Sequence, residues 1–113
     1  MERKTLYVDY LFSSKEKLKE NLNKKVNQIK DTLKNVERKY GNDNKIIVKN
    51  SAMIDLKESL VLALSYIAML NSDKVKEYKD EVIQKLAYIK ENRILTLDQY
   101  RDAYWLLKQI LEL

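Results

Sequence analysis

The sequence has no cysteine, no histidine and no proline, and it has a single glycine among 113 residues. Without cysteine there is no disulfide or thiolate chemistry, and without histidine the commonest general base and metal ligand is missing. Proline and glycine make up roughly 5% and 7% of an ordinary protein and interrupt helices, so their near absence predicts long helices joined by short connections. A single glycine also excludes the phosphate-binding loops, which need several.

Of the 113 residues, 45% are apolar and 35% are charged, and the chain has the length of one domain. We expect residues 1–113 to form a single all-α domain. Residues 1–12, MERKTLYVDYLF, mix charges into an apolar stretch that is too short for a signal peptide. No apolar run approaches the ~20 residues of a membrane span. We therefore expect a cytoplasmic protein without a membrane partner or a cofactor.

A long first helix is predicted over residues 14–40. Ser13 and Glu16 have the spacing of a capping box at its start, and Gly41 supplies the left-handed residue that commonly ends a helix. At a rise of 1.5 Å per residue this helix is ~10 Å longer than the others, so one end should project or pack on something outside the bundle. Its apolar residues follow heptad spacing: Leu22, Val26, Ile29, Leu33, Val36 and Tyr40.

Three further helices are predicted over residues 50–70, 72–92 and 96–113. Short connections between them make consecutive helices antiparallel neighbours, so the predicted fold is an antiparallel four-helix bundle with a long basic first helix. The expected boundary residues are Asn50 or Ser51, Asn71, Ser72 or Asp73, Asn92, and the capping box of Thr96 and Gln99 with Leu95 and Tyr100 as its hydrophobic staple.

Two segments are rich in aromatic and β-branched residues, residues 5–12 and residues 46–48. One interpretation is that they are extended and pair as two short strands, the first being an N-terminal arm. The other is that both are apolar tethers laid on the helical core. The sequence leaves these alternatives open.

Residues 60–70, LVLALSYIAML, have one polar member, Ser65, so this helix should be covered on almost every side. Its least apolar stripe consists of Asp55, Glu58, Leu62, Ser65 and Met69. Each fully buried Leu or Met side chain stabilises the fold by roughly 1.5–3 kcal/mol, which disfavours leaving this stripe exposed to water. Either the N-terminal arm or a second copy should cover it, and Leu62, Ser65 and Met69 are the predicted interface.

The net charge of +5 is concentrated in residues 14–40, which hold nine basic and four acidic side chains. Opposite the heptad seam lie Lys17, Lys24, Lys34 and Arg38. Such a face is suited to phosphate groups, so these four residues are candidates for nucleic-acid binding. A basic face that is merely solvated, or one that meets an acidic protein, fits the same residues.

Two other groups of residues have a structural and a functional interpretation. Tyr100, Tyr104 and Trp105 resemble a base-stacking group beside basic residues, but at helical spacing they more often belong to a core or an interface. The carboxylates of Glu77, Asp80 and Glu81 share one helix face, yet Glu81 and Lys85 have the spacing of a favourable salt bridge. We interpret these carboxylates as a solvated face without a metal.

The sequence thus favours a non-catalytic interaction or assembly subunit with protein partners, including further copies of itself. The alternative is a nucleic-acid-binding accessory or nucleoprotein-coating subunit that uses the basic face of the first helix. An enzyme is not expected.

Overall fold

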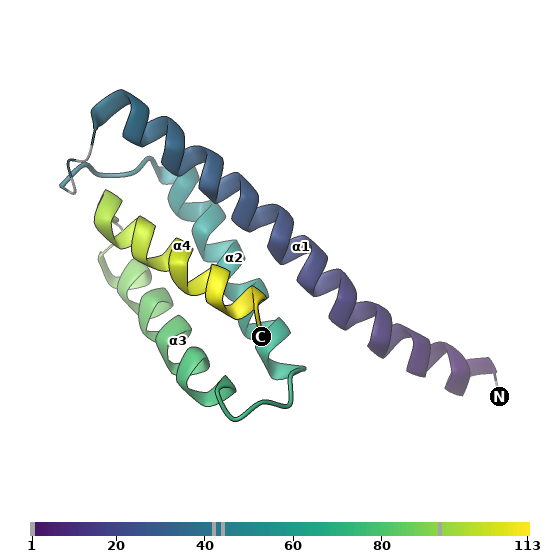
Figure 1. Ribbon diagram of the computed structural model, residues 1–113. Helices are drawn as coiled ribbons and strands as arrows, with labels where there is room; N and C mark the ends of the chain where they lie inside the picture. The colour runs from purple at the N-terminus through teal and green to yellow at the C-terminus, as the bar shows by residue number, and fades with distance from the viewer. Residues whose placement is uncertain (1, 42, 44, 93) are drawn as a thin grey trace.

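A computed structural model describes residues 2–41, 43, 45–92 and 94–113, with side chains described from Lys15 onward. The helices are α1 (Glu2–Tyr40), α2 (Asn50–Ala68), α3 (Val75–Asn92) and α4 (Leu97–Leu111). Each runs antiparallel to the one before it, as Figure 1 shows. The predicted all-α antiparallel four-helix bundle with a long first helix is therefore confirmed.

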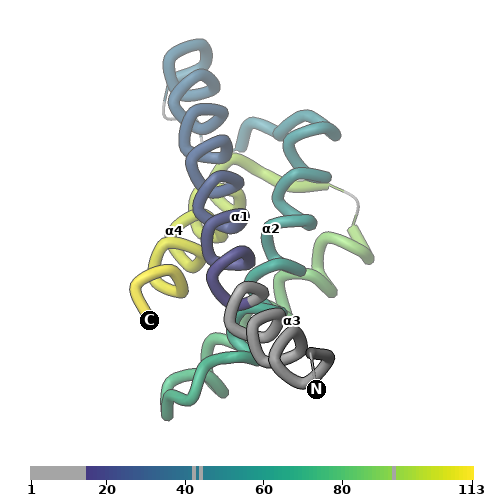
Figure 2. The backbone as a smooth tube through the Cα atoms, turned by 90° about the vertical axis from the view of Figure 1, so that its right-hand side faces the viewer, coloured from purple at the N-terminus to yellow at the C-terminus, as the bar shows by residue number. Residues whose placement is uncertain are grey.

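Helix α2 makes the largest share of the contacts between helices, and in this sense it is the centre of the bundle. Like α4, it packs against the three other helices, whereas the described parts of α1 and α3 have no contact with each other. Figure 2 shows α1 in front, with α4 on one side of it and α2 on the other. Helix α2, which holds most of the apolar stretch of residues 60–70, is thus in contact with three different helices. Among the described residues no further helix lies against its remaining flank, between α1 and α3.

The heptad seam of α1 forms its contribution to the core. Leu22, Val26, Ile29 and Leu33 are buried, and Val36 packs at the edge of the core. Tyr40, the last residue of the predicted seam, is 48% exposed because it lies at the end of α1, beside the loop. The seam therefore ends about one turn before the helix does.

Helix α1 is much longer than its partners. It has 39 residues, against 19 in α2, and the molecule measures 57 × 24 × 23 Å. At 1.5 Å per residue α1 spans ~58 Å, which accounts for the long dimension. Its Glu2 end continues past the other helices (Figure 1), as the predicted projection of one end requires.

The boundary residues were predicted with mixed success. Gly41 has a φ of +71° and its N–H donates to Glu37 O at 2.7 Å, which ends α1 as predicted. At the start of α4, Thr96 Oγ1 accepts from Gln99 N and Gln99 Oε1 accepts from Thr96 N, so the capping box is confirmed. Helix α2, however, ends at Ala68, and its N-cap is Lys49, which makes no side-chain cap hydrogen bond.

The extended N-terminal arm was predicted wrongly. Residues 5–12 are helical, and α1 passes through Ser13 without the boundary that the capping-box spacing indicated. No proline or glycine precedes Gly41, and adding one more residue to an existing helix is far easier than starting a new one. Strand propensity is a weak preference that such propagation overrides.

Residues 46–48 are extended, but their partner differs from the predicted one. Val48 N donates to Leu95 O at 2.9 Å, and Leu97 N donates to Ile46 O at 2.6 Å. Ile47 and Thr96 form an antiparallel bridge between these bonds. The α1–α2 and α3–α4 connections are therefore joined at one end of the bundle, and pairing with residues 5–12 is excluded.

Candidate functional site

The uncovered flank of α2 carries a stripe of exposed side chains, which we call the open face: Ile54, Glu58, Val61, Ser65, Ala68 and Met69. Its large apolar members are substantially exposed, Ile54 at 48%, Val61 at 53% and Met69 at 39%. Together with Glu58 and Ser65 they form a series that recurs every three to four residues, so they lie along one side of the helix. No segment among the described residues buries this face, and residues 5–12 continue α1 as a helix, which overturns the alternative of an extended N-terminal arm as its cover.

The predicted interface residues do not all lie on the open face. Ser65 and Met69 are exposed there, whereas Leu62 is half-buried and packs against the core at the α1 side of α2. The observed face is rotated by ~50° away from α1 relative to the predicted stripe. Sequence reasoning missed Ile54 and Val61 because it took acidic residues to mark the outermost side. Their place in the series Ile54, Glu58, Val61 and Ser65, with steps of three to four residues, is the signal that would have found them.

Asp55 lies off the centre of the open face because it faces a cation on α1. Lys25 Nζ lies 2.6 Å from Glu58 Oε2 and 3.9 Å from Asp55 Oδ1. The hydrogen bond to Glu58 raises the pKa of the Lys25 ammonium, burial opposes the rise, and the charges of Glu58 and Asp55 add to it. The two carboxylates therefore line the junction of α1 and α2.

Further ion pairs join the remaining helices. Arg101 of α4 donates from Nε and Nη2 to Glu37 Oε1 of α1, at 3.3 and 3.2 Å. Lys85 of α3 lies 3.6 Å from Asp102 of α4. Such partly exposed pairs contribute about 0–1 kcal/mol each, so they fix the alignment of helices more than they hold the core together.

The four cations predicted to bind nucleic acid are all exposed on α1: Lys17, Lys24, Lys34 and Arg38. At ~100° per residue they lie on the side of α1 opposite the buried seam. None of them takes part in an ion pair with another described residue. Asp31 lies in the middle of this face and interrupts it.

The aromatic group of α4 is divided between core and surface. Tyr100 and Tyr104 are buried, as the structural interpretation predicted. Trp105 is 56% exposed and its ring meets that of Tyr104 edge-on at 5.4 Å. A base-stacking surface would need several exposed rings, and here only Trp105 of the three is accessible.

The carboxylates of Glu77, Asp80 and Glu81 are exposed on α3. In the described part of the chain no three metal-ligating side chains lie close enough together to hold a metal ion. Within those same residues, no helix combines the length and apolar character needed to cross a membrane.

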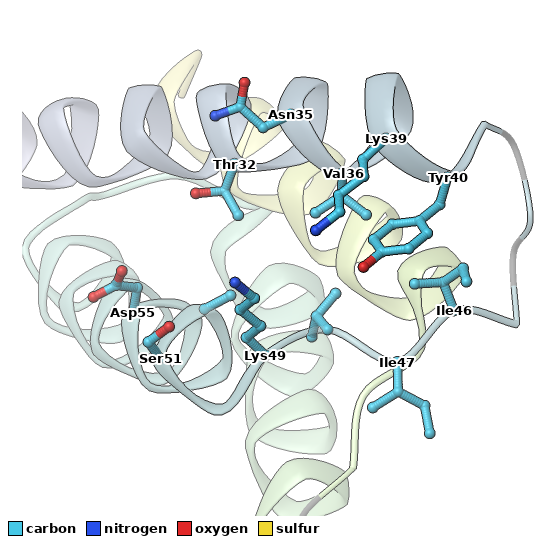
Figure 3. Close-up of a pocket in the computed structure, with 12 residues that line it drawn as sticks. Thr32, Asn35, Val36, Lys39, Tyr40, Ile46, Ile47, Lys49, Ser51 and Asp55 are labelled. Atoms are coloured by element: carbon cyan, nitrogen blue, oxygen red, sulfur yellow. The ribbon is translucent and has the colours of Figure 1, made fainter.

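A pocket of about 440 Å³ lies where the end of α1 meets the start of α2. Figure 3 shows the ammonium group of Lys39 extending from α1 and that of Lys49 rising from the start of α2, with the Tyr40 hydroxyl group close by. Asp55 and Thr32 lie toward the end of the pocket away from Tyr40. The apolar part of its lining consists of Val36, Ile46, Ile47, Val48 and Ala52.

Tyr100 lies in the core near this pocket, and its hydroxyl group makes no hydrogen bond to a described residue. The residue is 1% exposed, and its Oη atom has no hydrogen-bond partner among the described residues. Burial raises the pKa of Tyr100 to about 12, the nearby Thr32 hydroxyl opposes the rise, and the charge of Asp55 adds to it. Thr32 thus lies close enough to the Tyr100 hydroxyl group to affect its pKa, but the two groups do not have the geometry of a hydrogen bond. Both groups that act on Tyr100 also line the pocket.

Neither the family models, nor the curated proteins, nor the solved structures contain a match to this chain.

Proposed function

We propose that this protein is a non-catalytic interaction or assembly subunit that associates with a second copy of itself through the open face of α2. The observation that carries the proposal is the exposure of Ile54, Val61 and Met69 on the helix that otherwise forms the centre of the bundle. Apolar residues scattered singly over a surface need no explanation, but these three share one side of one helix.

The pattern of the open face is complementary to itself. Along α2 the order is Ile54, Glu58, Val61, Ser65 and Met69, so apolar and polar residues alternate symmetrically about Val61. A two-fold axis at Val61 would bring Ile54 of one copy to Met69 of the other and Glu58 to Ser65. The Ser65 hydroxyl would then donate to a carboxylate, and the small Ala68 would let the helices approach closely. Such self-complementarity is what a two-fold dimer requires.

The apolar area of this face offsets only the lower part of the cost of association, so the dimer should be weak. Each of its three large apolar side chains has roughly half of its surface left to bury, worth ~1 kcal/mol, or ~6 kcal/mol for two copies. Losing the freedom of two separate molecules costs an estimated 4–15 kcal/mol. Ile83 of α3 is 44% exposed. It points away from α4, because Lys85, which pairs with Asp102 of α4, lies about 200° from Ile83 around the axis of α3. Contacts from Ile83 would extend the interface.

Sedimentation equilibrium over a range of concentrations tests the proposal. We expect the mass to rise above 13.5 kDa with concentration, and Val61→Lys to hold the chain at 13.5 kDa. Ile47→Lys is the matched control, since Ile47 is 60% exposed and lies in the α1–α2 loop, outside the open face. A wild-type chain that stays monomeric at every concentration, or a Val61→Lys variant that associates as the wild type does, would refute the proposal.

A second candidate function is nucleic-acid binding by α1. The observation in its favour is that four cations of α1 are exposed and form no ion pair with another described residue: Lys17, Lys24, Lys34 and Arg38. Affinity for a labelled DNA duplex should then fall steeply with salt. Changing the four residues to Glu should abolish binding, whereas Lys76→Glu on α3 should not. Absence of binding at low salt would eliminate this candidate.

A further inference from the structure

We propose that the pocket between the end of α1 and the start of α2 binds a small organic anion, whose acidic group lies between Lys39 and Lys49 and whose apolar body lies against Val36 and Ile46. This site is separate from the open face of α2. It would give the subunit a ligand of its own.

The dimensions and lining of the pocket fit such a molecule. Its volume of about 440 Å³ lies within the roughly 300–1,000 Å³ of small-molecule sites. Val36 and Ile46 are partly buried and pack against the core, so the apolar wall is held in place. The 46–48 segment that forms one side is fixed by its hydrogen bonds to Leu95 and Leu97. The pocket therefore exists without rearrangement of the helices.

The charge around the pocket favours an anion. Lys39 and Lys49 extend toward the pocket from opposite sides, and neither is in an ion pair with a described residue. Helix α2 begins here with no acidic residue in its first turn and no side-chain cap, so its first N–H groups lack a side-chain acceptor. Asp55 is the one carboxylate in the lining, and Lys25 lies 3.9 Å from it.

The probe is 8-anilinonaphthalene-1-sulfonate, a sulfonate on an aromatic body, titrated by its fluorescence into the wild-type chain. We expect saturable binding of one probe per chain. The Lys39→Gln/Lys49→Gln variant should bind at least tenfold more weakly, because it loses two charge-assisted contacts.

Two controls isolate the site. Lys74→Gln/Lys76→Gln makes the same change of charge at exposed positions near the start of α3 and should leave the affinity unchanged. N-phenyl-1-naphthylamine, which has the same rings without the sulfonate, should not distinguish Lys39→Gln/Lys49→Gln from the wild type. Equal binding of the sulfonate by that variant and the wild type, or equal weakening in the α3 control, would overturn the proposal.

Discussion

Replacing Tyr100 by Phe removes the only buried side-chain polar atom without a partner in the described part of the chain. Tyr100 is 1% exposed, and its ring remains in place in the variant because Phe has the same shape apart from the hydroxyl group. Leaving a buried hydroxyl unsatisfied costs about 1–3 kcal/mol, and losing the packing of its oxygen offsets part of the gain. We therefore expect Tyr100→Phe to raise the free energy of unfolding by about 1 kcal/mol near neutral pH, a reversal of the usual effect of core substitutions.

The same substitution should change how stability depends on pH. The folded-state pKa of Tyr100 is about 12, against 10.0 for an ordinary tyrosine. A raised pKa means that the neutral phenol is favoured in the folded state, so this contribution is complete below pH ~10 and is lost as pH rises toward ~12. At 1.36 kcal/mol per pKa unit the loss is roughly 2–3 kcal/mol. The stability advantage of Tyr100→Phe over the wild type should widen by that amount across this interval.

Urea unfolding followed by far-ultraviolet circular dichroism, near pH 7 and near pH 11, measures both effects, and near pH 11 about half of the pH-dependent loss should have occurred. Tyr88→Phe is the control, because Tyr88 is 42% exposed on α3. A variant less stable than the wild type near pH 7 would mean that the Tyr100 hydroxyl has a partner in solution. A stability difference that stays constant with pH would refute the account of its burial.

Three further substitutions test the fold by the same urea assay. Leu60→Ala truncates a fully buried side chain of α2 and should cost about 2–5 kcal/mol; a cost below 1 kcal/mol would contradict the central position of α2. Gly41→Ala forces a side chain into a backbone with φ +71°, at a cost of about 1 kcal/mol, and a neutral result would mean that α1 ends differently. Lys25→Met removes the ion pair with Glu58 and should lower the free energy of unfolding by no more than ~1 kcal/mol, with a smaller loss at high salt. A loss that salt does not change would assign the effect to packing.

Local signals in the sequence predicted the helices well. The seam from Leu22 to Leu33 is buried, Gly41 ends α1 and Thr96 caps α4, because each of these depends on neighbours within one or two turns. Residues 5–12 were misjudged, because strand propensity was given more weight than the absence of any helix-breaking residue before Gly41.

Features that depend on the meeting of distant segments could not be predicted in the same way. An extended conformation was one of two interpretations of residues 46–48, and nothing local indicates that Leu95 and Leu97 provide their hydrogen bonds. The direction of the open face depends on how α1 packs against α2, since Lys25 holds Asp55 and Glu58 at that junction. The pocket likewise joins α1 to a loop and to α2, so its residues form no motif in the sequence.

Disulfide trapping at position 61 tests the self-association of α2 most directly, because the chain has no cysteine of its own. A two-fold axis at Val61 brings the two copies of this residue together, within the ~4 Å Cβ separation that a disulfide needs. Mild oxidation of Val61→Cys should therefore give a covalent dimer in high yield, while Tyr88→Cys on α3 stays monomeric. Equal trapping of the two variants, or a Val61→Cys chain that stays monomeric at concentrations where the wild type associates, would contradict the proposed interface.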